Sequence, residues 1–420
     1  MKRATLQLLL IFLLVLELIP TPSRAQQEAA YQHPFPVPAG LESAVEFWKK
    51  IFSEYGLAQL VYFDPDDPAK IYEVVEVGEE SRSNQYINSE RARIAEAHGV
   101  DIDRVKAQRG VKERTASGIK RSGRYIAQIQ EIFRDRGLPP ELSYLPVVES
   151  SYDIYARSSV GALGIWQFMP RTGREYMRVN SAVDERRDPI ESSRAAASYL
   201  KQAYEYLGSW PLAITSYNYG QGGMARAVAT IGSNDLVELI RSYNHPYFGF
   251  APKHFYAEFV AAVEVASDLA KYFPGLELDA AAPIHERELS ANTTIAALTN
   301  STGLSRDELL AWNPALSASI KVVPAGYRVK LPANGNSEPL VALAQAPQIA
   351  RPANQAQVKS VSASTPTRAP TQVVHHRVKR GETLIQIAQR YGASVQRILQ
   401  FNGLRHAHLL RVGTTLRIPS

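Results

Sequence analysis

The stretch Glu149-Ser150-Ser151-Tyr152-Asp153 puts a carboxylic acid at the end of an apolar run that is typical of a helix. Apolar neighbours raise the pKa of a carboxyl group, because burial disfavours its charged form. An acid that keeps its proton near neutral pH can protonate a poor leaving group. Glu149 is therefore the first candidate for a general acid. The apolar residues before it are Leu142, Leu145, Val147 and Val148.

Asp153 is the nearest candidate for a second catalytic carboxylate. It lies at position i+4 from Glu149 and would share a helix face with it if the helix continued. Aspartate at such a boundary more commonly caps a helix end or fixes a loop. We therefore expect a structural role for Asp153.

A second motif, Gly161-Ala-Leu-Gly-Ile-Trp-Gln-Phe-Met-Pro170, follows closely. Gly161 and Gly164 permit a tight backbone path that could line a cleft, although simple turns use glycine in the same way. Gln167 offers a donor and an acceptor, which suits the acetamido group of a sugar, but an amide satisfied within the fold would explain it too. Met169 by itself would be interpreted as a core residue.

A third motif, Ala213-Ile-Thr-Ser-Tyr-Asn-Tyr-Gly220, contains Tyr217 and Asn218. A phenol hydroxyl can hydrogen-bond a carboxyl group and hold its rotamer. The chain has 21 tyrosines, so Tyr217 alone would carry little weight. The motif around it makes it a candidate.

Together the three motifs resemble those of lysozyme-like lytic transglycosylases, and the stretch from about Leu138 to Met224 is similar to the murein transglycosylase D type. The resemblance implies a mainly α fold, with a lysozyme-like catalytic domain of the goose type (SLT) that acts on bacterial peptidoglycan. It implies that Glu149 is the catalytic residue. The family's sugar-contacting residues fall on Ser158, Gln167 and Met169. The resemblance also implies substrate-site roles for Tyr217, whose hydroxyl would approach Glu149, and for Asn218, which would line the substrate site.

The resemblance also implies a reaction with one catalytic acid and no cofactor. Glu149 would protonate the oxygen of the β-1,4 bond between N-acetylmuramic acid and N-acetylglucosamine. Its carboxylate would then act as a base on the C6 hydroxyl of the muramic acid ring, which attacks the anomeric carbon. The product would be a 1,6-anhydromuramic end, formed without water.

Two other functions stay open at the level of sequence. A hydrolytic muramidase with the same fold and acid would use an activated water in place of the C6 hydroxyl, and only the product distinguishes it. An inactive peptidoglycan-binding scaffold would have lost catalysis. The presence of Glu149, Gln167, Tyr217 and Asn218 argues against it, because a decayed site would be expected to lose one of them.

The amino-terminal residues 1–25 are typical of a cleaved signal peptide. Met1-Lys-Arg3 precedes an apolar stretch from Leu6 to Ile19, and Ser23-Arg24-Ala25 supplies a cleavage signal. A membrane anchor is disfavoured, because spanning a bilayer takes about 20 apolar residues. The chain has no cysteine, so no thiol can carry a lipid. We expect export to the periplasm or cell envelope.

The length of 420 residues predicts several domains. Residues 26–130 are expected to form a helical amino-terminal region, since Leu41, Val45, Trp48, Ile51 and Phe52 recur at helical spacing. The catalytic domain is expected over residues 131–275. Helices are predicted at about residues 84–99, 121–136 and 260–269, and after the cap at Asp188-Pro189.

An internal repeat occupies the carboxyl-terminal part, where residues 294–313 match residues 383–402 at an offset of 89. Each copy is predicted to fold as strand, helix, helix, strand. The copy at 374–419 resembles the LysM domain, which binds glycans containing N-acetylglucosamine. The copy at 283–332 resembles it only in degenerate form, because Ala291-Asn-Thr-Thr replaces the Gly-Glu-Thr turn. Residues 333–371 are expected to be a flexible linker.

The formal net charge of +6 comes from lysines and arginines that are scattered along the chain, so we expect no nucleic-acid partner. The expected partner is the glycan strand of peptidoglycan, bound by a monomer, and peripheral membrane association stays open. His375-His376 and His406-x-His408 lack an accompanying carboxylate cluster, so we expect no metal site. No cofactor is implied.

Overall fold

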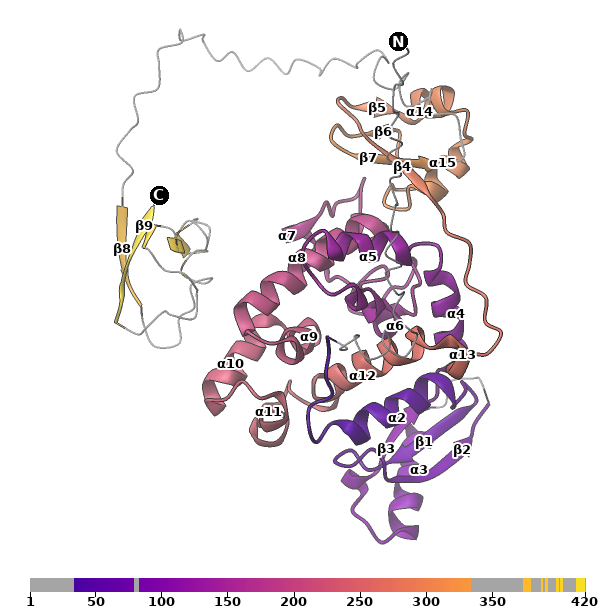
Figure 1. The fold of residues 1–420 in the computed structure, drawn as a ribbon, viewed down its shortest axis with the longest axis vertical. Coiled ribbons are helices and arrows are strands. Elements are labelled where there is room, and N and C mark those ends of the chain that lie inside the picture. The colour runs from indigo at the N-terminus through magenta and orange to yellow at the C-terminus, as the bar shows by residue number, and fades with distance from the viewer. Residues whose placement is uncertain are drawn as a thin grey trace, which may run out of the picture. The chain divides into compact units, whose positions relative to one another are not determined.

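The computed structural model describes residues 34–78, 83–333, 373–378 and 413–419, with the single positions 387, 390, 391, 398, 399, 401 and 402. The expected signal peptide and nearly all of the expected linker lie outside these residues. The described part is mostly helical, which confirms the predicted fold class (Figure 1).

The first helix, α2 (Glu42–Ser53), forms where the apolar spacing predicted it. Val45, Trp48 and Ile51 are buried on one face, and this face packs against the long helix α12 (Phe250–Ser267). Trp48 donates a hydrogen bond from Nε1 to Nδ1 of His254 at 3.2 Å. The helix therefore belongs to the core of the catalytic region.

A three-stranded antiparallel sheet corrects the expectation of an all-helical region over residues 26–130. Strands β1 (Gln59–Phe63), β2 (Ile71–Glu76) and β3 (Lys106–Arg109) lie in the order β2-β1-β3, and helix α3 (Asn84–Ala97) packs beside them. Residues 60–63 of the central strand are all buried, so the alternation that reveals a strand in a sequence is missing.

The helix predicted at residues 121–136 is interrupted. Helix α4 (Lys112–Ser122) ends, and α5 (Ile126–Arg134) begins after a break at Gly123. A Cβ on Gly123 would lie 2.3 Å from the carbonyl oxygen of Asp279, and the Asp279 amide donates to the Lys120 carbonyl at 2.9 Å. A distant segment thus crosses the chain at the break, which a local pattern cannot reveal.

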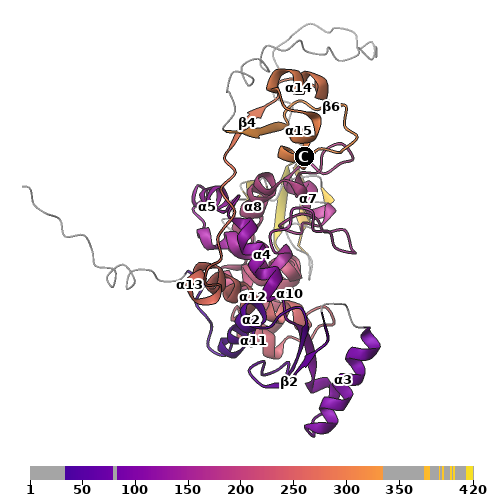
Figure 2. The same cartoon turned by 90° about the vertical axis from the view of Figure 1, so that its right-hand side faces the viewer.

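The catalytic region is built from short helices around a few long ones (Figure 2). The Asp188 side chain caps α8 (Pro189–Leu207) by accepting from the amides of Ile190 and Glu191, as its position before a proline predicted. Helix α12 starts at Phe250, well before the expected residue 260. The sequence did not reveal this start, because the helix is apolar on most of its surface and shows no clear apolar stripe. The other elements are η2 (Pro140–Tyr144), α6 (Leu145–Ser150), α7 (Pro170–Tyr176), η3 (Glu185–Arg187), α9 (Trp210–Tyr219), α10 (Gln221–Ile231), α11 (Leu236–Ser242) and α13 (Leu269–Tyr272).

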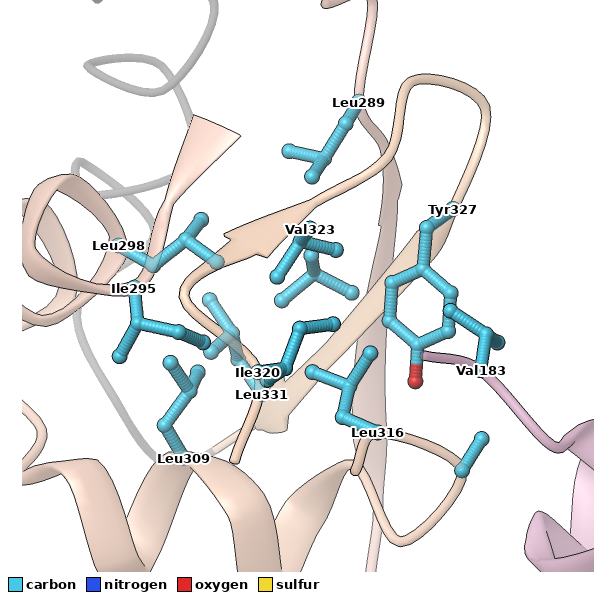
Figure 3. Close-up of a cluster of buried hydrophobic side chains, with 12 residues drawn as sticks. Val183, Leu289, Ile295, Leu298, Leu309, Leu316, Ile320, Val323, Tyr327 and Leu331 are labelled. Carbon is cyan, nitrogen blue, oxygen red and sulfur yellow. The ribbon is translucent and has the colours of Figure 1, made fainter. Parts of the chain in front are cut away.

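The first repeat copy folds as strand, helix, helix, strand, with a short extra ladder. Its core receives Val183 from the catalytic region, and Val183 lies beside Tyr327 (Figure 3). Val183 also pairs as a β-bridge with Leu316, so the copy is docked on the catalytic region. Its elements are β4 (Ile284–Glu288), β5 (Thr293–Thr294), α14 (Ile295–Thr302), α15 (Arg306–Trp312), β6 (Val322–Val323) and β7 (Arg328–Pro332).

In the second copy, the two outer strands are described. Strands β8 (Val373–Arg377) and β9 (Thr415–Pro419) pair antiparallel, with His376 opposite Leu416. Most of the two predicted helices between them lies outside the described residues.

Candidate active site

Helix α6 is short and ends directly after Glu149. Ser151 and Tyr152 have φ values of 50° and 58°, a left-handed conformation that non-glycine residues rarely adopt. The buried Tyr152 is held there, because its hydroxyl donates to the Ser143 carbonyl. The chain therefore turns sharply beside the candidate acid, at a cost in backbone strain that is typical of functional sites.

Asp153 does not share a helix face with Glu149, because the helix has already ended. Its Oδ1 accepts a hydrogen bond from the amide of Tyr155 at 2.9 Å. This contact confirms the loop-fixing role expected for Asp153.

Glu149 lies on the wall of a cavity of about 590 Å³. Its side chain is half-buried, and within the described part of the chain the carboxyl group has no hydrogen-bond or ion-pair partner. Residues of the loop after α2, of α4 and of α6 line the cavity; they include Leu57, Arg114, Ser117, Arg121, Val148 and Asp153. The cavity leaves room for a substrate group next to the carboxyl.

Burial raises the pKa of Glu149 to about 8. The carboxyl group therefore keeps its proton at neutral pH, as a general acid requires. The sequence predicted that apolar surroundings would raise the pKa of Glu149. The structure agrees, since Leu145 and Val147 of the same helix are buried.

The sequence analysis missed a second carboxyl group, Glu258 on α12. Burial and the negative charge of Glu149 raise the pKa of Glu258 to about 8. The signal in the sequence is one acid within the apolar run from Phe255 to Val263. Only the packing of α12 against α6 relates that acid to Glu149.

The second motif forms a loop that is fixed to α6 and to η3. Ser150 donates from Oγ to the carbonyl of Ile165 at 2.8 Å. The buried Arg186 donates to the carbonyls of Gly161 and Phe168 at 2.9 and 3.0 Å. Gly164 has a φ of +79°, and a Cβ there would lie 1.8 Å from the carbonyl oxygen of Arg186. Glycine is thus required at this close approach.

Gln167 uses both of its amide donors within this loop. Nε2 donates to the carbonyls of Ala156 and Gly164 at 3.2 and 2.8 Å. These two contacts directly support the alternative that Gln167 is an amide satisfied within the fold. Its Oε1 is left as the atom that could accept a hydrogen bond from a sugar.

Ser158 and Met169 lie at the two ends of the same loop region. Oγ of Ser158 accepts from the amide of Ala162 at 2.8 Å, and as a hydroxyl it still has its own proton to donate. Met169 is 41% exposed, so it is not the core residue that its residue type alone suggested. Both side chains remain candidates for substrate contact.

Tyr217 on α9 donates its hydroxyl to the carbonyl of Trp166 at 2.8 Å, rather than to Glu149. Burial and the nearby charge of Glu149 raise the pKa of Tyr217 well above its ordinary value. The tyrosine therefore lies close to the acid and ties the second motif to the third. Asn218, the next residue, is exposed. The substrate-binding roles of these two residues stay predictions.

Two negative findings apply to the described residues only. None of their helices is both long and apolar enough to cross a bilayer. Nor do their histidine and carboxylate side chains form a group of three that could bind a metal ion.

Comparisons with known proteins agree with the two motif-based resemblances. Residues 127–239 match the family described as the Transglycosylase SLT domain, and residues 376–419 match the LysM domain. Over 327 residues the chain is 27% identical to the membrane-bound lytic murein transglycosylase D of Escherichia coli (strain K12). That alignment covers 75% of this chain and 69% of the relative.

Two solved structures are also similar to parts of the chain. A lytic transglycosylase Slt from Pseudomonas aeruginosa has a TM-score of 0.29 and 21% identity over 36% of this chain. The 70 kDa soluble lytic transglycosylase of Escherichia coli has a TM-score of 0.29 and 20% identity over 35% of this chain. The chain spans a quarter of the length of each, 25% in both cases.

Proposed function

Because the chain carries a transglycosylase SLT domain at residues 127–239 and a LysM domain at residues 376–419, we propose that it is a lytic transglycosylase of peptidoglycan. It cleaves the β-1,4 bond between N-acetylmuramic acid and N-acetylglucosamine and leaves a 1,6-anhydromuramic end. The observation that carries the proposal is Glu149, whose carboxyl group has no partner among the described residues, lies on the wall of a large cavity and has its pKa raised to about 8 by burial.

In the first step, protonated Glu149 donates its proton to the glycosidic oxygen. The bond between that oxygen and the anomeric carbon breaks, and positive charge develops on the muramic acid ring. Since burial keeps the proton on Glu149 at neutral pH, the acid is ready without a further proton donor.

In the second step, the Glu149 carboxylate accepts the proton of the C6 hydroxyl, and the C6 oxygen bonds to the anomeric carbon. The acid is regenerated, and water is neither added nor removed. No cofactor is needed. The half-buried position of Glu149 favours this return of the proton, since a charged carboxylate is poorly stabilised there.

Residues of the second and third motifs, with Ser158, hold the substrate in this proposal. Oε1 of Gln167 and the hydroxyl of Ser158 meet polar groups of the sugars, and the exposed Met169 contacts a ring face. Tyr217 fixes the loop of the second motif beside the acid, and Asn218 adds a polar contact.

The LysM domain binds the glycan and keeps the catalytic domain near its substrate, which raises the local concentration of cleavable bonds. The protein acts as a monomer. It is exported to the periplasm or cell envelope, where its polymeric substrate lies.

The test is digestion of purified peptidoglycan by residues 26–420, followed by mass spectrometry of the released muropeptides. Anhydro-ended products that disappear in Glu149→Gln would support the proposal. Products with reducing ends, heavier by one water, would identify a hydrolytic muramidase instead. Binding to the polymer with no release by the unmutated protein would identify a scaffold.

A further inference from the structure

One face of α4 carries two arginines into the cavity that holds Glu149. Arg114 and Arg121 are seven residues apart, which places them on the same side of a helix, and both line the cavity. Ser117 lies between them on this face and lines it as well. The face therefore presents two permanent positive charges to the site of Glu149.

Gly118 brings this face close to the turn that follows Glu149. A Cβ at Gly118 would lie 2.7 Å from the carbonyl oxygen of Ser151 and 2.8 Å from its Cβ. Arg121 donates from Nη2 to the same carbonyl at 2.6 Å. The arginine is thus held against the turn that follows Glu149.

The two guanidinium groups have donors to spare. In Arg121 only Nη2 donates a hydrogen bond within the described residues, Nε is buried without a partner, and Nη1 is left to donate. Arg114 makes no hydrogen bond or ion pair with any residue in the described part of the chain. An arginine offers five N–H donors in a planar fork, which matches a carboxylate.

Three acids also line the cavity, and two of them each accept one hydrogen bond from a backbone amide. Glu113 accepts from the amide of Leu57 at 2.8 Å, and Asp153 accepts from the amide of Tyr155 at 2.9 Å. Glu149 keeps its proton at neutral pH. The groups of the cavity that can donate charge-assisted hydrogen bonds to an anion are the two arginines.

We propose that Arg121 and Arg114 form an anion subsite that binds a carboxylate of the peptide stem on the muramyl residue being cleaved. The inference rests on the proposed function, since a peptidoglycan strand brings such a carboxylate beside its scissile bond. It makes the peptide-bearing strand the preferred substrate. Charge-assisted hydrogen bonds to the stem would then position the sugar over Glu149.

The test compares two substrates: glycan strands with intact peptide stems, and strands stripped of them by an amidase. Arg121→Gln and Arg114→Gln should each lower kcat/KM on the peptide-bearing strands about 10-fold. On the stripped strands, which keep only the lactyl carboxylate, the rates of both variants should match the unmutated protein. Lys112→Gln, which removes one charge from the same helix away from the cavity, is the matched control and should match it on both substrates.

Equal losses on both substrates would overturn the proposal, because a purely structural role of Arg121, or a contact with the lactyl group, would act on both. Unchanged rates on the peptide-bearing strands would overturn it too. If Arg121→Gln folds poorly, Arg114→Gln still tests the proposal, since Arg114 makes no hydrogen bond or ion pair with the described residues. If the unmutated protein released no anhydro products at all, the proposed function would fail, and that result is distinct from either outcome above.

Discussion

At the residue scale, the central property of the site is the proton on Glu149. A general acid works only while it is protonated, and burial raises the pKa of Glu149 to about 8. We expect the rate of anhydro-muropeptide release to be lost as the pH rises through about 8, and to hold through the neutral range. A rate profile from pH 6 to 10 measures this. A rate that halves near pH 5 instead would mean an ordinary carboxyl group at this position.

The same pKa predicts the pH dependence of stability. The folded pKa of about 8 lies above the ordinary value of 4.5 for a glutamate, so ionisation favours the unfolded chain, and the cost grows as the pH rises from 4.5 to 8. The linkage amounts to about 3 kcal/mol at pH 7, as an upper limit for a half-buried group. Glu149→Gln should therefore raise Tm at pH 7.5 and leave it nearly unchanged at pH 4.5. Thermal denaturation at both values tests the sign, and a lower Tm at pH 7.5 would contradict it.

At the scale of elements, the loop of the second motif depends on the close approach of Gly164 to Arg186. Alanine at Gly164 would put a Cβ 1.8 Å from a carbonyl oxygen and would be strained by the φ of +79°. We expect Gly164→Ala to abolish activity and to destabilise the fold by more than about 2 kcal/mol, measured by denaturant unfolding. Gly232→Ala is the control, since its φ is +78° with no atom within 4 Å. It should cost about 1 kcal/mol and leave activity intact.

At the scale of the whole molecule, the first repeat copy is docked on the catalytic region through a buried ion network. Lys330 is 3% exposed, and its Nζ lies 2.8 Å from Asp188 and 3.3 Å from Glu191. Burial lowers the pKa of the amine, but the charges of Asp188 and Glu191 outweigh this and hold it above its ordinary value. Removing Lys330 would leave the fully buried Asp188 without its cation.

We expect Lys330→Ala to reduce the free energy of unfolding of the catalytic region by about 3 kcal/mol. The internal repeat offers a matched control at Arg417, which occupies the corresponding position of the second copy at an offset of 87 and is exposed. Arg417→Ala should change stability by less than about 0.5 kcal/mol. Calorimetry of both variants is the measurement, and similar Tm values for the two would contradict a structural role of the docked copy.

Local patterns allowed much of this architecture to be predicted. The helix at residues 42–53 and the cap at Asp188 follow from apolar spacing and from side-chain chemistry within a few residues. The sheet at residues 59–109 could not be predicted, because residues 60–63 of its central strand are all buried and show no alternation. The break at Gly123 depends on a segment more than a hundred residues away.

The amino-acid sequence was enough to identify the candidate acid, the three motifs and the two domain types that the comparisons support. These follow from residue type and short spacing. The folded chain was needed to show which groups meet: Tyr217 donates to the Trp166 carbonyl, Glu258 lies within electrostatic reach of Glu149, and the arginine face of α4 lines the cavity that holds Glu149. The reason is physical, since burial and hydrogen bonding at this site arise between segments that are distant along the chain.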